Sequence, residues 1–160
     1  DGDKWRRVVA SPVPQEIPDT RVIKLLLEAG VVVICAGGGG IPVIRREDGG
    51  LIGVEAVVDK DASSALLALS LKADALLLLT DVDAVYQGFG TDSAKALTTI
   101  TPEEALALDL PDGSMGPKVR AAARFAVQGG FCGIGRLQDA LHLLGGMAGT
   151  RIAPAQGKWA

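Results

Sequence analysis

Uniformly apolar runs separate segments of helical periodicity along most of this chain. Such runs are typical of strands that are buried on both faces of a sheet. They predict buried strands over residues 31–36 and 75–80, and shorter, less uniform segments predict strands over 7–10, 131–134 and 150–152. Each of these runs is too short to cross a bilayer, so the sequence predicts no membrane-spanning segment and no membrane partner.

Apolar residues at helical spacing fill the intervals between these strands. The predicted helices cover residues 19–29, 61–71, a segment that begins at 101, 117–127 and 137–144. Asp19 and Thr101 are residue types that cap helix N-termini, and Gly30 suits the left-handed position that follows a helix. Polar and glycine-rich loops are expected over 45–50 and 88–93, and 51–58 is compatible with either strand or loop.

The alternation of strand and helix predicts an α/β fold in which helices cover both faces of a mostly parallel sheet. We expect one domain over 1–153 and a tail over 154–160. The chain begins with aspartate, and a strand pattern follows almost at once, so we expect it to be part of a longer protein. In open α/β sheets, ligands bind beyond the carboxyl ends of the strands.

Composition narrows the functional classes. The 160 residues are 48% apolar, which excludes an intrinsically disordered chain. A net charge of −3 and an aromatic content of 4%, with no basic stripe, argue against a nucleic-acid partner. Cys35 and Cys132 lie in apolar runs and are expected to be reduced core thiols of a cytoplasmic protein. His142, the single histidine, is expected on a helix face, so the chain lacks a zinc-ligand set.

Four consecutive glycines, Gly37, Gly38, Gly39 and Gly40, follow the apolar run 31–36. Neither the G-x-G-x-x-G nor the Walker pattern fits, because isoleucine and proline come next. One or two glycines would suffice for a tight turn, which is the alternative interpretation. We therefore favour a concave nest of backbone N–H groups that binds an anion.

A second candidate anion site is the sequence GSMGPK at 113–118. Pro117 fits the first turn of a helix, and Gly116 would let a ligand approach the helix end. The free N–H groups of that end favour negative charge, and Lys118 adds a full positive charge. The alternative is an ordinary loop-to-helix junction with a solvated lysine.

A third cluster, VDKD at 58–61, places Lys60 between Asp59 and Asp61. A solvated charge cluster is the simplest interpretation. Phosphoryl transfer, however, needs mainly positioning and positive charge around the moving group. Lys60 and Lys118 on opposite sides of a phosphoryl group would supply that charge, and an aspartate between them would orient both.

Five motifs in order resemble those of carbamate kinases, members of the amino-acid kinase superfamily: WRRVVASPVP, VVICAGGGGIPV, GVEAVVDKDASSALLA, LLLLTDVDAVY and GSMGPK. The resemblance extends to about residue 152 and covers about the C-terminal half of the family's usual chain. It implies a three-layer αβα sandwich that lacks its N-terminal half in this sequence. It also implies reversible phosphoryl transfer between ATP and carbamate, giving ADP and carbamoyl phosphate.

The resemblance implies roles for individual residues. Lys60 and Lys118 would stabilise charge on the transferring phosphoryl group, Asp61 would orient them, and the four glycines would hold the phosphoryl group and the acceptor. The nucleotide would contact Thr80, Asp81, Val82, Tyr86, Met115, Gly116 and Pro117. Mg²⁺ would be bound through the nucleotide phosphates and not by a protein metal site. A homodimer, a cytoplasmic location and a place in arginine metabolism are also implied.

The chain departs from the family's pattern at two places. The family usually has an asparagine before the Phe-Gly that follows the nucleotide strand, where this chain has Gln87-Gly88-Phe89-Gly90. The family's N-terminal glycine loop and protruding subdomain are also absent from this sequence. We therefore expect an exposed sheet edge and apolar face, which a separate chain carrying the N-terminal half would cover. Two alternatives stay open: a catalytically incomplete nucleotide-binding fragment, and an amino-acid kinase acting on an acyl-amino acid or a nucleoside monophosphate.

Overall fold

The computed structural model describes residue 5, residues 8–111 and residues 113–155. Residue 7 of the first expected strand and most of the expected tail, 156–160, lie outside the described residues. The helices are α1 (Thr20–Glu28), α2 (Lys60–Leu71), α3 (Pro102–Leu106), α4 (Met115–Ala126) and α5 (Ala140–Leu144), with a short 3-10 helix, η1 (Leu137–Asp139), before α5. The strands are β1 (Val43–Arg45), β2 (Leu51–Gly53), β3 (Ala75–Thr80), β4 (Val85–Gln87), β5 (Lys95–Leu97), β6 (Thr99–Ile100), β7 (Phe131–Arg136) and β8 (Thr150–Ile152).

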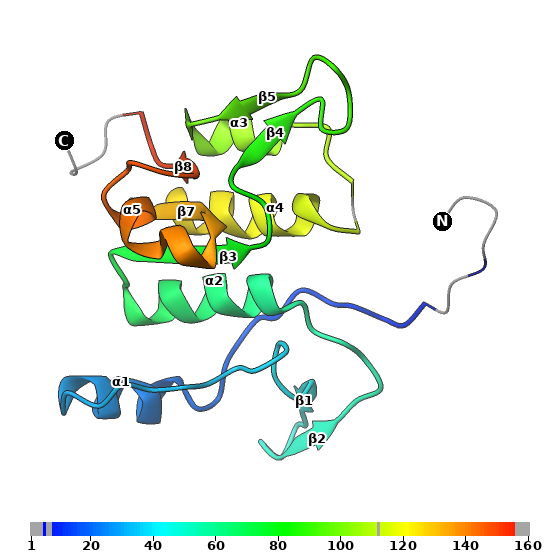
Figure 1. Ribbon diagram of the computed structural model, residues 1–160. Coiled ribbons are helices and arrows are strands. Elements are labelled where there is room, and N and C mark those ends of the chain that lie inside the picture. The colour runs from blue at the N-terminus through cyan, green and yellow to red at the C-terminus, as the bar shows by residue number, and fades with distance from the viewer. Residues whose placement is uncertain (1–4, 6–7, 112, 156–160) are drawn as a thin grey trace.

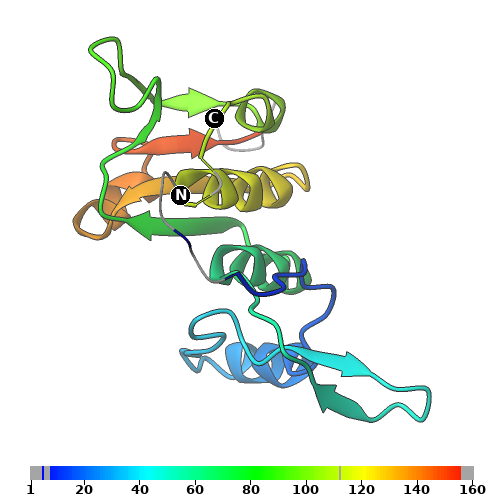
Figure 2. The ribbon, with the colours of Figure 1, turned by 90° about the vertical axis from the view of Figure 1, so that its right-hand side faces the viewer.

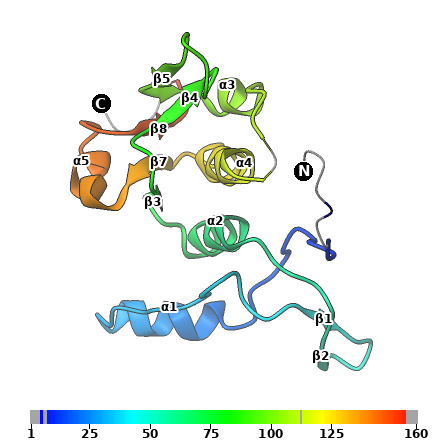
Figure 3. The same cartoon turned by 45° about the vertical axis from the view of Figure 1, so that its right-hand side comes forward.

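The main sheet has the strand order β3-β7-β8-β6 and forms the middle of three layers. The strand β3 is parallel to β7, from Ala75 opposite Phe131 to Thr80 opposite Arg136, and β6 is parallel to β8. The β7–β8 pair is antiparallel, so the expected mostly parallel sheet is mixed. In Figure 3, α2 and α4 lie on one side of the sheet and α5 lies on the other, which confirms the αβα arrangement.

Small residues let the helices approach the sheet closely. In α4 the alanines at 121–123 and 126 are buried, and Phe125 and Ile134 fill the space between helix and sheet. On the other face, a Cβ atom added at Gly135 would lie 3.0 Å from the Leu143 side chain of α5. This dense packing makes α4 and the sheet rigid, so side chains at their ends are held in fixed positions.

The topology places the first turns of α2 and α4 at the same edge of the sheet. The helix α2 leads directly into β3 and α4 leads into β7, and these two strands are parallel. Each helix therefore runs back against its strand and begins beyond the carboxyl ends of β3 and β7, as Figure 1 shows. Ligands bind at this edge in open α/β sheets.

The amino-terminal part of the chain departs from the expected pattern. The helix α1 and the β1–β2 hairpin lie beyond α2, away from the main sheet (Figures 1 and 2). Residues 31–36 form no strand, and the side chains of Val32 and Ile34 are 90% and 98% exposed. Residues 8–10 likewise form no strand. A strand needs a series of backbone hydrogen bonds to a neighbouring segment. Among the described residues, the Val57 N–H donates to the Ala10 carbonyl oxygen at 2.9 Å, but this bond is not part of a ladder.

Several local expectations are confirmed and others need correction. Thr101 forms a capping box with Glu104 at the start of α3, and 88–93 is a loop. Residues 51–53 form a strand, and the rest of 51–58 is loop. The helix α4 begins at Met115, so Pro117 is its third residue. Cys35 is exposed and not in the core, whereas Cys132 is buried as expected. Among the described residues, no helix has the length and apolarity needed to span a membrane.

Candidate active site

Asp61 lies between the two lysines that the sequence singled out. The Nζ atom of Lys118 lies 3.1 Å and 3.0 Å from the two carboxylate oxygens of Asp61. The Nζ atom of Lys60 lies 3.7 Å from one of the same oxygens. Residues that are far apart in the sequence thus form one charge cluster at the start of α2 and α4.

Local sequence explains how α2 presents this carboxylate. The side chain of Asp59 caps the helix by accepting a hydrogen bond from the Ala62 N–H at 2.9 Å. That cap makes Lys60 and Asp61 the first two helical residues, where a carboxylate also interacts favourably with the helix dipole. Lys118 reaches Asp61 from the first turn of α4, which packs along α2.

The two lysines differ in their surroundings. The side chains of Lys118 and Asp61 are only 8% and 9% exposed, whereas that of Lys60 is 61% exposed. Burying a charge is costly unless it is paired and hydrogen-bonded, and each buried group here has the other as its partner. Lys118 is therefore held in one position, while Lys60 is free to turn toward a ligand in solvent.

The thiol of Cys132 lies on β7 near the buried pair. Burial raises the pKa of Cys132 to about 12, and the nearby Lys118 ammonium only partly opposes this. The thiol therefore remains protonated and unreactive at neutral pH. Its place is in the core beneath the charge cluster.

The glycine run lies against the start of α2. Gly39 is buried, and a Cβ atom added to it would lie 2.0 Å from the Val58 carbonyl oxygen and 3.3 Å from the backbone nitrogen of Lys60. Its φ angle of +133° and that of +91° at Gly40 belong to the region that favours glycine. Added Cβ atoms at Gly37, Gly38 and Gly40 would meet nothing within 4 Å. Gly39 thus packs against the start of α2, whereas the space beside the other three glycines is open.

Sequence reasoning did not identify the residue that holds this loop. The Oγ atom of Ser63, in the first turn of α2, donates a hydrogen bond to the Gly39 carbonyl oxygen at 2.7 Å. Ser63 is 3% exposed. A serine inside an apolar helical pattern was the available signal, but the pattern alone does not say what the hydroxyl would meet.

The residues expected on the nucleotide side fall into two groups. Met115, Gly116 and Pro117 form the first turn of α4, directly before Lys118. Gly116 is closely packed, because an added Cβ atom would lie 2.8 Å from the Pro111 carbonyl oxygen. Its smallness therefore serves the folding of the preceding loop.

The second group follows the carboxyl end of β3. The hydroxyl of Thr80, the last residue of β3, donates to the Asp81 carboxylate at 3.1 Å, and half-buried Val82 follows. Tyr86, on β4, donates from its hydroxyl to Asp83 at 3.1 Å. This hydrogen bond, with burial and the Asp83 charge, raises the pKa of Tyr86. Both groups lie near the edge of the sheet where α2 and α4 begin.

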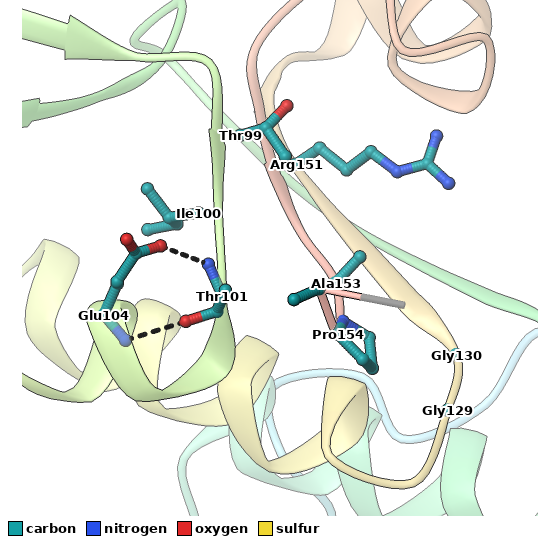
Figure 4. Close-up of a pocket in the computed structure, with 10 residues that line it drawn as sticks. Thr99, Ile100, Thr101, Glu104, Gly129, Gly130, Arg151, Ala153 and Pro154 are labelled. Atoms are coloured by element: carbon teal, nitrogen blue, oxygen red, sulfur yellow. Dashed lines mark hydrogen bonds between the residues drawn. The ribbon is translucent and has the colours of Figure 1, made fainter. Parts of the chain in front are cut away.

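Two of the cavities among the described residues have linings that include neither Lys60 nor Lys118. One, of about 610 Å³, lies between 12–19, the glycine loop and the β1–β2 hairpin, and it reaches Gly39 and Ser63. The other, of about 290 Å³, lies beside α3. Figure 4 shows that the polar groups of Thr101 and Glu104 there bond to each other. The first cavity adjoins the candidate site and the second does not.

The described fold thus places a carboxylate and two lysines together at the carboxyl edge of an αβα sheet. The chain matches the model of the amino acid kinase family over residues 4–133, and it belongs to that family. It is 52% identical over 153 residues to the carbamate kinase of Haemophilus influenzae, a match that covers 95% of this chain and 49% of that protein. Identity to the carbamate kinase of Rhizobium meliloti is 50% over 156 residues, covering 96% and 48%.

Solved structures of carbamate kinases are also similar to this chain. The carbamate kinase from Giardia lamblia bound to AMP-PNP superimposes with a TM-score of 0.88 at 43% identity, covering 96% of this chain and 50% of that chain. The UMP kinase from Bacillus anthracis, at 18% identity and a TM-score of 0.58, shares the fold alone. The chain spans about half the length of the curated relatives it matches.

Proposed function

We propose that this chain supplies the nucleotide- and phosphoryl-binding part of a carbamate kinase. The reaction is reversible transfer of a phosphoryl group between ATP and carbamate, giving ADP and carbamoyl phosphate. The observation that carries this proposal is the buried Asp61 carboxylate with Lys118 and Lys60 on it. Phosphoryl transfer proceeds largely through positioning and electrostatic stabilisation, and two oriented ammonium groups are suited to both.

Each charged group has a separate part in this proposal. Asp61 accepts from the buried Lys118 ammonium with both oxygens and keeps it in a defined position, so that its remaining N–H is preorganised toward an oxygen of the transferring group. Lys60, which is more exposed, closes on the same group when substrate binds. The N–H groups of Gly37 and Gly39 already donate to the Cys35 and Ala36 carbonyl oxygens, so those of Gly38 and Gly40 would donate to the oxygens of the phosphoryl group and of the small substrate that receives it.

The nucleotide would lie along the edge formed by 80–86 and the first turn of α4. The likeness to an AMP-PNP-bound carbamate kinase supports this placement. Mg²⁺ would enter with the nucleotide and neutralise its phosphate charge, as it does in many kinase sites. Both oxygens of the buried Asp61 carboxylate already accept hydrogen bonds from Lys118. We therefore expect Mg²⁺ to be bound by the nucleotide phosphates and not by Asp61.

The proposal is tested by ATP formation from ADP and carbamoyl phosphate. We expect Lys118→Ala to lower turnover by at least about 10²-fold, the scale of losing one preorganised oxyanion donor. Lys72→Asn is the control, because it removes a lysine at the opposite end of α2 and asparagine tolerates the left-handed conformation there. Turnover of Lys118→Ala within a few-fold of wild type would remove Lys118 from this role.

Two other functions would give different results in the same experiment. ADP binding in calorimetry without any turnover would identify a catalytically incomplete nucleotide-binding unit. Phosphorylation of an acyl-amino acid or a nucleoside monophosphate, with no response to carbamoyl phosphate, would identify a different amino acid kinase.

We also propose that a polypeptide corresponding to the other half of the curated relatives covers the apolar face of this chain. Exposed apolar side chains are concentrated before residue 58, and β3 is an edge strand of the described sheet. The unmatched half of the Haemophilus influenzae protein, purified with this chain, should form a complex. Ile34→Asp should abolish that complex, and Leu141→Asp on α5 should not. Retention by both variants would refute this surface.

A cytoplasmic homodimer, as the resemblance implies, completes the proposal. Light scattering of the chain bound to that half should give twice the mass of the complex. A single copy in solution would contradict the dimer.

A further inference from the structure

We propose that Ser63 is a positioning residue that holds the glycine loop in a fixed relation to Lys60 and Lys118. This inference rests on the proposed function, since it assigns to that site the part that orients its backbone amides. The hydroxyl of Ser63 bonds the Gly39 carbonyl oxygen at 2.7 Å, across 24 positions of sequence. Both residues are buried.

The geometry of Gly39 makes this bond sensitive to small displacements. An added Cβ atom would lie 2.0 Å from the Val58 carbonyl oxygen, so the loop backbone rests directly on the chain that enters α2. The Gly39 N–H donates to the Ala36 carbonyl oxygen at 2.8 Å, which leaves the carbonyl of Gly39 for the helix side. Ser63 satisfies that carbonyl, and a buried acceptor without a partner is costly.

Ser63 is itself fixed by α2. Its N–H donates to the Asp59 carbonyl oxygen at 3.0 Å, in the turn that also carries Lys60 and Asp61. The chain of contacts therefore runs from Lys118 through Asp61 to α2, and from Ser63 to the glycine loop. A shift of the loop would move its amides relative to both ammonium groups.

Removal of the Ser63 hydroxyl should make the glycine loop more mobile and leave the contacts of Asp61 with both lysines intact. In Ser63→Ala, the Gly39 carbonyl loses its buried partner, while Asp61 keeps both lysines. We expect amide hydrogen exchange at Gly39 to become roughly tenfold faster. We also expect the KM for carbamoyl phosphate to rise by about tenfold, with a smaller change in the KM for ADP.

Ser64 provides a matched control in the same turn. Its hydroxyl donates to the Lys60 carbonyl oxygen at 2.7 Å and makes no bond to the loop. Ser64→Ala should leave both the Gly39 exchange rate and the KM for carbamoyl phosphate within twofold of wild type. Ser63→Thr, which keeps a hydroxyl at the position, should recover much of what Ser63→Ala loses.

Exchange is measured on the chain itself, and the KM values on the chain together with the unmatched half of the relative. Equal exchange in Ser63→Ala and Ser64→Ala would overturn the positioning role, as would faster exchange with an unchanged KM for carbamoyl phosphate. If the wild-type complex forms no ATP, the proposed function fails. The exchange comparison then still decides whether Ser63 holds the loop.

Discussion

The buried pair of Lys118 and Asp61 allows a stability prediction that does not depend on catalysis. In Lys118→Met, a side chain of similar length replaces the ammonium, and the Asp61 carboxylate loses the two contacts of 3.0 and 3.1 Å. The carboxylate stays in a site where its side chain is 9% exposed. Its remaining partner is Lys60, at 3.7 Å and largely in solvent.

The expected magnitude follows from these surroundings. Breaking a buried ion pair by removing one partner costs about 3–5 kcal/mol, because an uncompensated charge stays behind. An exposed lysine such as Lys60 restores no more than about 1 kcal/mol. We therefore expect Lys118→Met to lower the free energy of unfolding by about 3–4 kcal/mol. Lys60→Met should lower it by less than about 1 kcal/mol.

Urea unfolding followed by circular dichroism provides the measurement. With a slope of about 2 kcal/mol per molar urea, the midpoint of Lys118→Met should fall by roughly 1.5–2 M. Adding Asp61→Leu to Lys118→Met should recover about half of the loss or more, since an apolar pair replaces the stranded charge. Equal midpoints for the two lysine variants would refute the buried pair. A double variant less stable than Lys118→Met would do the same.

Three further predictions concern the glycine loop and single side chains. Gly39→Ala should lower the free energy of unfolding by about 2 kcal/mol or more, and Gly38→Ala by less than about 1 kcal/mol. Of these two glycines, only Gly39 has a positive φ and a carbonyl oxygen where the added methyl group would lie. Equal losses in urea unfolding would contradict the packing of Gly39 against α2. A thiol reagent at pH 8 should label the exposed Cys35 within minutes and Cys132 only after unfolding, because burial raises the pKa of Cys132 to about 12; two thiols labelled in the native chain would refute it. Absorbance titration of Tyr86, the single tyrosine, should give a midpoint above that of free tyrosine, because its hydroxyl donates to a neighbouring carboxylate that raises its pKa; a lower midpoint would rule that bond out.

The fold was predicted well where local pattern and tertiary environment agree. The strand at 75–80, the helix expected over 61–71 and the helix cap at Thr101 form close to the expected positions, because short-range spacing and capping chemistry specify them. The strand predicted over 31–36 does not form, because there the local pattern and the tertiary environment disagree. Its residues favour a strand, but a strand forms only beside another backbone, and periodicity contains no information on whether one is present.

The candidate site divides in the same way. The sequence by itself determined which groups are available, because Lys60, Asp61, Lys118 and four adjacent glycines stand out in any reading of residue type and spacing. Only the tertiary structure decided that the Lys118–Asp61 pair is buried while Lys60 is exposed, and that Ser63 holds the loop. These contacts join positions 24 and 57 residues apart, and their strength depends on burial between packed helices, which a local pattern does not encode.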